Sequence, residues 1–150
     1  MPHFGLIPNN ISDIERLLLR ARLHWRGGNI RFSKNQIDDG VAAHYDALIS
    51  AMYSYALKSE KEHRLDIDKS MNLDDDFVLF NILDDNSVFT SQFSCEDFMF
   101  LHQTLELALS DKLSDLDVDK FVSLIEKALK QLDVLPFEEN ELPSNLVITT

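Results

Sequence analysis

His44, Tyr45 and Asp46 are consecutive residues of types that carry out acid–base chemistry. They lie in an amphipathic stretch with helical periodicity, in which neighbouring side chains diverge by about 100°. Asp46 should therefore point away from His44, and the two do not form a dyad by adjacency. Because Leu48 and other apolar residues border it, we predict a half-buried His44 that a neighbouring helix satisfies, with a role in an open cleft as the alternative.

Glu60 and His63 have the i, i+3 spacing of the Glu-x-x-His pairs that bind two metal ions in helical bundles. Such a site needs a second pair and further carboxylates, and the sequence has no second Glu-x-x-His. The chain also contains no glycine-rich phosphate loop, CxxC pair or GxSxG elbow. The sequence therefore predicts no catalytic residue, metal ligand or cofactor.

Basic side chains cluster on an N-terminal segment with helical periodicity. Arg16 and Arg20 flank its apolar face on one side, and Arg22 and Arg26 flank it on the other. Arginine makes bidentate contacts to phosphate or carboxylate, so this helix could meet RNA or an acidic protein. In the alternative interpretation, the arginine stems cover the core and balance the acidic remainder of the domain. The candidate functional surface consists of Arg16, Arg20, Arg22, His24, Arg26 and His44.

The charge is unevenly distributed over a chain of 150 residues, a length that suits one domain. The net charge is −12, yet residues 1–35 carry six basic and only two acidic side chains. The acidic remainder should repel nucleic acid, which leaves only the basic segment for RNA. No apolar run reaches the length of a membrane span, no secretory signal is recognisable, and one cysteine suits a reducing compartment, so we expect a cytoplasmic protein without membrane contact.

The stretch from Gln36 to Leu57 has the clearest helical pattern and should form the centre of the fold. One face carries large apolar side chains, namely Ile37, Val41, Tyr45, Leu48, Met52, Tyr55 and Ala56. A second stripe carries small residues, namely Gly40, Ala43, Ala47, Ala51 and Ser54. Small residues at this spacing let another helix approach closely, so the helix should be buried on more than one side.

Local signals predict where this helix and its predecessor begin and end. Ser12 and Glu15 form a capping box for a first helix from about Ile11 to Trp25, which Gly27 and Gly28 should stop. Ser33 and Gln36 form a second capping box, and the central helix should reach the charged segment near Arg64.

Further helices follow a polar linker. Residues 77–83 suit either a short helix capped by aspartate or a buried strand, and the helical surroundings favour the helix. Ser94 and Asp97 open a helix from Cys95 to Leu109, and Ser114 or Asp117 caps a last helix from Val118 to about Val134 that Pro136 ends. The predicted fold is an all-α, four- to five-helix up-down bundle over residues 1–135, followed by an irregular tail, residues 136–150.

The first two helices resemble those of HEPN-domain proteins, which are small helical bundles. The second helix of that family carries an alanine- and tyrosine-rich pattern of the type A-x-Y-A-x-x-x-A-x-x-A-L. The resemblance covers about residues 12–60, and the pattern is approximated here by Ala43, Tyr45, Ala47, Ala51, Tyr55 and Leu57.

The resemblance implies a homodimer and, as in many family members, a small nucleotidyltransferase as partner in a toxin–antitoxin-like pair. Active members resemble metal-independent ribonucleases with an Arg-x(4–6)-His motif in a late helix. No arginine follows Arg64, and only three residues separate Arg20 from His24, so the motif is missing. We therefore expect a non-catalytic, dimeric interaction module. The alternatives are a ribonuclease-type enzyme that uses Arg20, His24 and His44, or a metal- or small-ligand-binding bundle.

Overall fold

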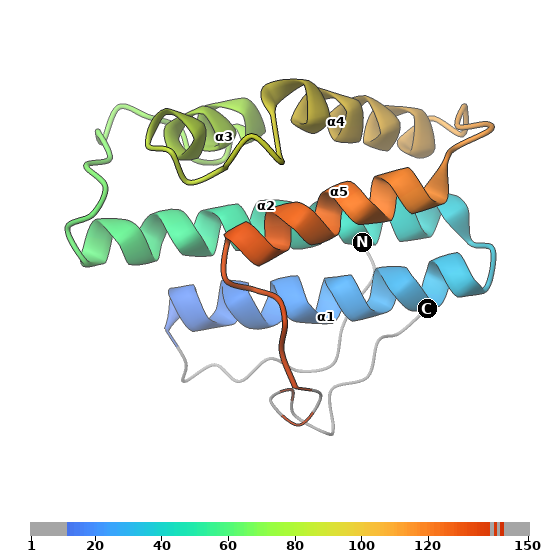
Figure 1. The fold of residues 1–150 in the computed structure, drawn as a ribbon, viewed down its shortest axis with the longest axis horizontal. Helices are drawn as coiled ribbons and strands as arrows, with labels where there is room; N and C mark the ends of the chain where they lie inside the picture. The colour runs from blue at the N-terminus through green and yellow to red at the C-terminus, as the bar shows by residue number, and fades with distance from the viewer. Residues whose placement is uncertain (1–11, 139, 141, 143–150) are drawn as a thin grey trace.

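Five helices make up the computed structural model, which describes residues 12–138, 140 and 142. They are α1 (Asp13–Ser33), α2 (Ile37–Lys61), α3 (Asp76–Asp85), α4 (Cys95–Leu109) and α5 (Val118–Gln131) (Figure 1). The described part of the chain contains no strand. The prediction of an all-α bundle is confirmed, and the segment 77–83 is helical.

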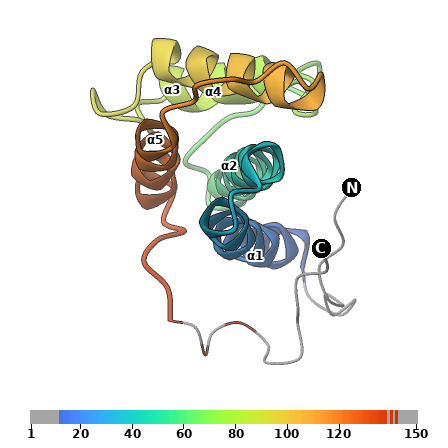
Figure 2. The same cartoon turned by 90° about the vertical axis from the view of Figure 1, so that its right-hand side faces the viewer.

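The central position of α2 is confirmed, because α2 packs against each of the other four helices. It forms an antiparallel hairpin with α1, while α3 and α4 form a layer on the opposite side and α5 lies along the flank (Figure 2). The small-residue stripe contacts α1, since Gly40 lies against Phe32 and the Ser54 hydroxyl donates to the Ile14 carbonyl at 2.9 Å. The large side chains of α2 face the α3–α4 layer, where the ring of Tyr45 stacks on that of Phe98.

The predicted stop at Gly27 and Gly28 is wrong, because α1 continues through both glycines to Ser33. Gly28 instead provides space at the helix crossing: a Cβ atom there would lie 2.0 Å from Cδ2 of His44. Two residues after the end of α1, Asn35 has a left-handed φ of 59°. The Gln36 N–H then donates to the Arg31 carbonyl at 2.8 Å, which is the bond that closes a Schellman motif.

Two further boundary predictions are corrected. Ser33 belongs to the end of α1, where its hydroxyl donates to the Ile30 carbonyl, and Gln36 caps α2 without a side-chain hydrogen bond, so the second capping box does not form. α2 ends at Lys61, within the charged segment near Arg64 as predicted, whereas α5 ends at Gln131 rather than Val134. All five helices end before a non-glycine residue with positive φ, namely Asn35, His63, Ser87, Asp111 and Asp133.

The predicted N-terminal caps are largely confirmed. Ser12 accepts a hydrogen bond from the Glu15 N–H, Ser94 and Asp97 form a complete capping box, and Asp117, not Ser114, caps α5. α3 is capped by Asp75, which accepts from two backbone N–H groups. The predicted start at Ile11 lies outside the described residues.

Part of the predicted irregular tail packs on α1. Phe137 and Leu142 join Leu19 and Leu23 in a small apolar cluster separate from the main core. The rest of the tail, residues 139, 141 and 143–150, lies outside the described residues. Within the described part of the chain, no helix combines the length and apolar composition that a membrane crossing requires.

Candidate functional site

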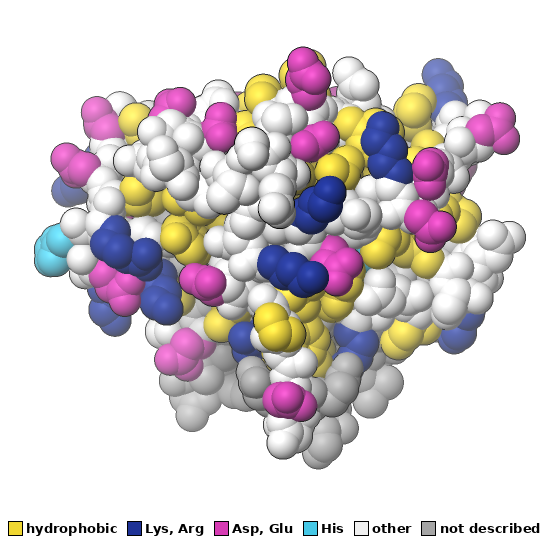
Figure 3. All heavy atoms as spheres, viewed as in Figure 1, with side chains coloured by type: hydrophobic (Ala, Val, Ile, Leu, Met, Phe, Trp, Pro, Cys, Tyr) yellow, Lys and Arg dark blue, Asp and Glu magenta, His cyan; other side chains and the backbone are white. Residues whose placement is uncertain are grey.

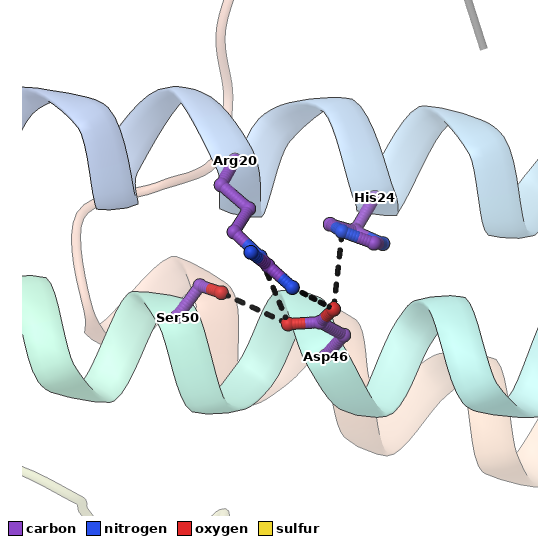
Figure 4. A network of polar contacts seen from close by, with 4 residues as sticks. All are labelled: Arg20, His24, Asp46 and Ser50. Carbon is purple, nitrogen blue, oxygen red and sulfur yellow. Dashed lines mark hydrogen bonds and ion pairs between the residues drawn. The ribbon is translucent and has the colours of Figure 1, made fainter. Parts of the chain in front are cut away.

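A polar cluster ties α1 to α2, and we call Arg20, His24, Asp46 and Ser50 the Asp46 cluster (Figure 4). The Arg20 guanidinium donates from Nη2 to Oδ2 of Asp46 at 2.7 Å and from Nε to Oδ1 at 3.3 Å. The Ser50 hydroxyl donates to Oδ1 at 3.1 Å, and Nε2 of His24 lies 3.1 Å from Oδ2. The Asp46 carboxylate thus contacts side chains from two successive turns of α1 and one side chain from its own helix, α2.

The electrostatics of the cluster keep His24 neutral. Its side chain is 1% exposed, and burial, followed by the charges of Arg20 and Arg31, lowers its pKa from 6.5 to about 3. The contact with Asp46 is therefore made by an uncharged imidazole at neutral pH. Asp46 and Arg20 reach the surface only in part, with side chains 25% and 34% exposed. This arrangement fixes the register of the two helices.

His44 lies in the core, which corrects the prediction that it is half-buried. The residue is 0% exposed, and its ring stacks on Trp25 at 4.6 Å and lies edge-on to Phe32 at 5.1 Å. Nε2 donates to the Trp25 carbonyl of α1 at 3.3 Å, so the predicted contact with a neighbouring helix is present, while Nδ1 has no hydrogen-bond partner among the described residues. Burial lowers the pKa of His44 to about 3, and the ring is neutral.

The arginines of α1 lie against the protein rather than standing free on the surface. Arg16, Arg22 and Arg26 are half-buried. The Nε of Arg22 donates to the Val134 carbonyl at 3.3 Å, and its guanidinium lies 5.4 Å from the centre of the Phe137 ring. The predicted candidate surface is therefore divided: Arg20 and His24 meet at Asp46, whereas Arg22 and His44 face α5 and the segment that follows it.

Sequence reasoning missed the role of Asp46. Arg20 and His24 are spaced four residues apart on α1, and Asp46 and Ser50 are spaced four residues apart on α2. Each pair shares a helix face, and two complementary polar pairs on helices that form a hairpin are a signal for facing positions. That pattern was present in the sequence, but recognising it requires the register between the helices.

The structure does not assemble the metal site that the bundle alternative requires. Glu60 and His63 lie exposed at the end of α2. Among the described residues, no group of three His, Cys, Asp or Glu side chains is placed to hold a metal ion.

Exposed apolar side chains gather instead on the α3–α4 layer and the linker that precedes it. Phe77, Met99, Leu107 and Leu109 belong to the two helices, and Met71 lies in the linker. Yellow apolar patches are visible between charged residues over this part of the molecule (Figure 3). Met99 and Leu107 are eight residues apart on α4 and therefore lie on the same side of that helix.

No protein-family model, curated protein or solved structure matches this chain. The resemblance to HEPN-domain proteins therefore rests on residues 12–60 of the sequence. The chemistry open to the protein follows from its own residues: two buried neutral histidines, arginines packed along α1, and an apolar α3–α4 face.

Proposed function

We propose that this chain is a non-catalytic helical interaction module that forms a homodimer and acts with a protein partner in the cytoplasm. The exposed apolar side chains of the α3–α4 layer carry the proposal. A helix on the surface of a monomer normally directs its large apolar side chains toward the core. α3 and α4 already bury Phe80, Phe98 and Leu101 there. Met99 and Leu107 remain exposed on α4, and burying them in an interface would stabilise association.

The outer side of α4 is suited to pairing with a second copy of itself. Met99, Gln103 and Leu107 are exposed and spaced four residues apart. Two α4 helices packed antiparallel about Gln103 would bring Met99 of one protomer to Leu107 of the partner subunit. A two-fold contact of this kind is self-complementary, because the contact between Met99 of one protomer and Leu107 of the partner subunit occurs a second time with the protomers exchanged.

The ribonuclease alternative receives no support from the site. Both histidines that it would use, His24 and His44, are buried and neutral, and they lie on different sides of the α1–α2 hairpin. A general acid or base must reach the substrate within hydrogen-bonding distance. The exposed free thiol of Cys95 agrees with a reducing compartment, and a nucleotidyltransferase is the kind of protein partner that the HEPN resemblance implies.

Light scattering coupled to size-exclusion chromatography tests the dimer. The wild-type protein should elute with twice the chain mass at micromolar concentration, and Leu107→Glu should elute as a monomer with an unchanged circular dichroism spectrum. Ile30→Glu is the matched control, because Ile30 is an exposed apolar residue on α1 and its change should leave the dimer intact. A wild-type monomer at the highest attainable concentration would overturn the proposal.

A further inference from the structure

A groove of about 480 Å³ lies at the end of the molecule where α1 begins and α2 and α5 end. The size falls within the range of about 300–1,000 Å³ that is typical of small-molecule sites. Its walls come from three segments: the first turns of α1, the C-terminal half of α2, and Leu132 to Val134 after α5. This groove is separate from the Asp46 cluster and from the outer face of α4.

The inner part of the groove is apolar. Its lining includes Ile14, Leu18, Ala51, Leu132 and Val134. The walls are held together by the hydrogen bond from the Ser54 hydroxyl to the Ile14 carbonyl, at 2.9 Å. An apolar lining on fixed helices favours an apolar ligand body, because the contact removes hydrocarbon surface from water on both sides.

Basic side chains stand where α2 ends. Lys58, Lys61 and Arg64 all line the groove, and Figure 3 shows Lys and Arg side chains gathered at this end of the molecule. Arg64 is engaged, since its Nη2 lies 2.7 Å from Oε1 of Glu62 and its guanidinium lies 5.5 Å from the centre of the Tyr55 ring. Lys58 and Lys61 have no ion-pair partner among the residues that the structure describes.

Two lysines of the lining lie close enough in sequence to act together. Lys58 and Lys61 are three residues apart on α2, a spacing that lets both ammonium groups reach one anion. The lining also contains three carboxylates: Glu62 is engaged by Arg64, and Glu15 and Asp133 come from α1 and from the segment after α5.

We propose that this groove binds an amphipathic anion, namely an aliphatic chain with a terminal carboxylate. The chain would lie on the apolar lining, and the carboxylate would lie between the ammonium groups of Lys58 and Lys61. The site takes no part in the proposed dimer, so it stands or falls independently of that proposal.

Titration of the ¹⁵N-labelled protein with sodium decanoate, followed by amide chemical shifts, tests the site. The largest shift changes should map to the groove, including Leu18, Ser54 and Val134. Lys58→Gln combined with Lys61→Gln should raise the Kd for decanoate about tenfold, since two exposed charge contacts are lost. The Kd for decanol, which has no charge, should stay the same in that variant.

The control is the double variant Lys112→Gln and Lys127→Gln, which removes the same charge from exposed lysines outside the groove. It should leave the Kd for decanoate unchanged. Shift changes that map elsewhere, an absence of shift changes, or equal weakening in both double variants would each overturn the proposal. So would an unchanged Kd in the Lys58 and Lys61 variant.

Discussion

Replacing Gly28 by alanine would create a steric clash between the new methyl group and the imidazole ring of His44. The new Cβ would lie 2.0 Å from Cδ2 and 2.7 Å from Nε2 of that ring. The ring has little room to move, because it stacks on Trp25 at 4.6 Å and lies 5.1 Å from the ring of Phe32. Either α1 and α2 separate or the imidazole leaves its place.

The change in the free energy of unfolding caused by Gly28→Ala is the sum of two destabilising contributions and one stabilising contribution. Carbon atoms pack best at about 3.5–4.0 Å, so the groups must move apart by about 1.5 Å or more, and overpacking of this kind costs about 1–3 kcal/mol. Displacing His44 also breaks its hydrogen bond to the Trp25 carbonyl, which contributes about 1 kcal/mol. Against this, alanine favours the helix over glycine by up to about 1 kcal/mol. We expect a net loss of about 1–3 kcal/mol in the free energy of unfolding.

Urea denaturation followed by the fluorescence of Trp25 measures this loss directly, because the chain has one tryptophan and it stacks on His44. The Tm should fall by about 2–12 °C for a chain of this size. The decisive arm is the same substitution made in a His44→Ala background. There the ring is absent, so Gly28→Ala should be neutral or should stabilise by up to about 1 kcal/mol.

The reasoning is refuted if Gly28→Ala leaves the wild-type protein as stable as before. It is equally refuted if the substitution destabilises both backgrounds to the same extent, because the cost would then not come from His44. In that case the glycine would serve the helix in some way other than the close approach of α1 and α2.

Two further predictions concern the core polar groups. Burial lowers the pKa of His44 from 6.5 to about 3, so as the pH falls the unfolded chain binds a proton at this residue before the folded chain does. The free energy of unfolding should therefore fall below about pH 6.5, by about 2 kcal/mol between pH 7 and 5 for this residue. Urea titrations should show a smaller fall in His44→Phe, which keeps an aromatic ring and cannot titrate. The Tyr45 hydroxyl donates to Oδ2 of Asp76 at 2.8 Å between α2 and α3, so Tyr45→Phe should cost about 1–2 kcal/mol in urea denaturation; an unchanged midpoint would contradict the contact.

Helix starts could be predicted from the sequence because their signals are local. Ser94 and Asp97 satisfy each other's backbone and side-chain groups within one turn, and α4 begins and ends where the sequence indicates. The ends of α1 and α5 could not be predicted, because the left-handed residue after each of these helices is not glycine. Asn35 and Asp133 tolerate that conformation, yet nothing marks them among the many other Asn and Asp residues.

The prediction that Gly27 and Gly28 end α1 failed for a related reason. A glycine pair has the same appearance in a sequence whether it ends a helix or lets a second helix approach. The two cases differ only in what lies opposite, and Gly28 lies opposite His44, 16 positions further along the chain. The same limit applies to Asp46, whose contacts with Arg20 and His24 depend on how α1 and α2 align, and local periodicity does not give that alignment.

The residue types that first suggested chemistry are the ones that the fold uses for packing. His44 fills the core and His24 lies buried beside Asp46, so their removal should cost stability. Function is then better sought among groups whose exposure the fold does not require, namely Leu107 and its neighbours on α4, and Lys58 with Lys61 beside the groove. These two surfaces lie on different helices and differ in character, one apolar and one cationic. Leu107→Glu should therefore leave decanoate binding intact, and the two lysine substitutions should leave the dimer intact, so each surface can be assigned or rejected without reference to the other.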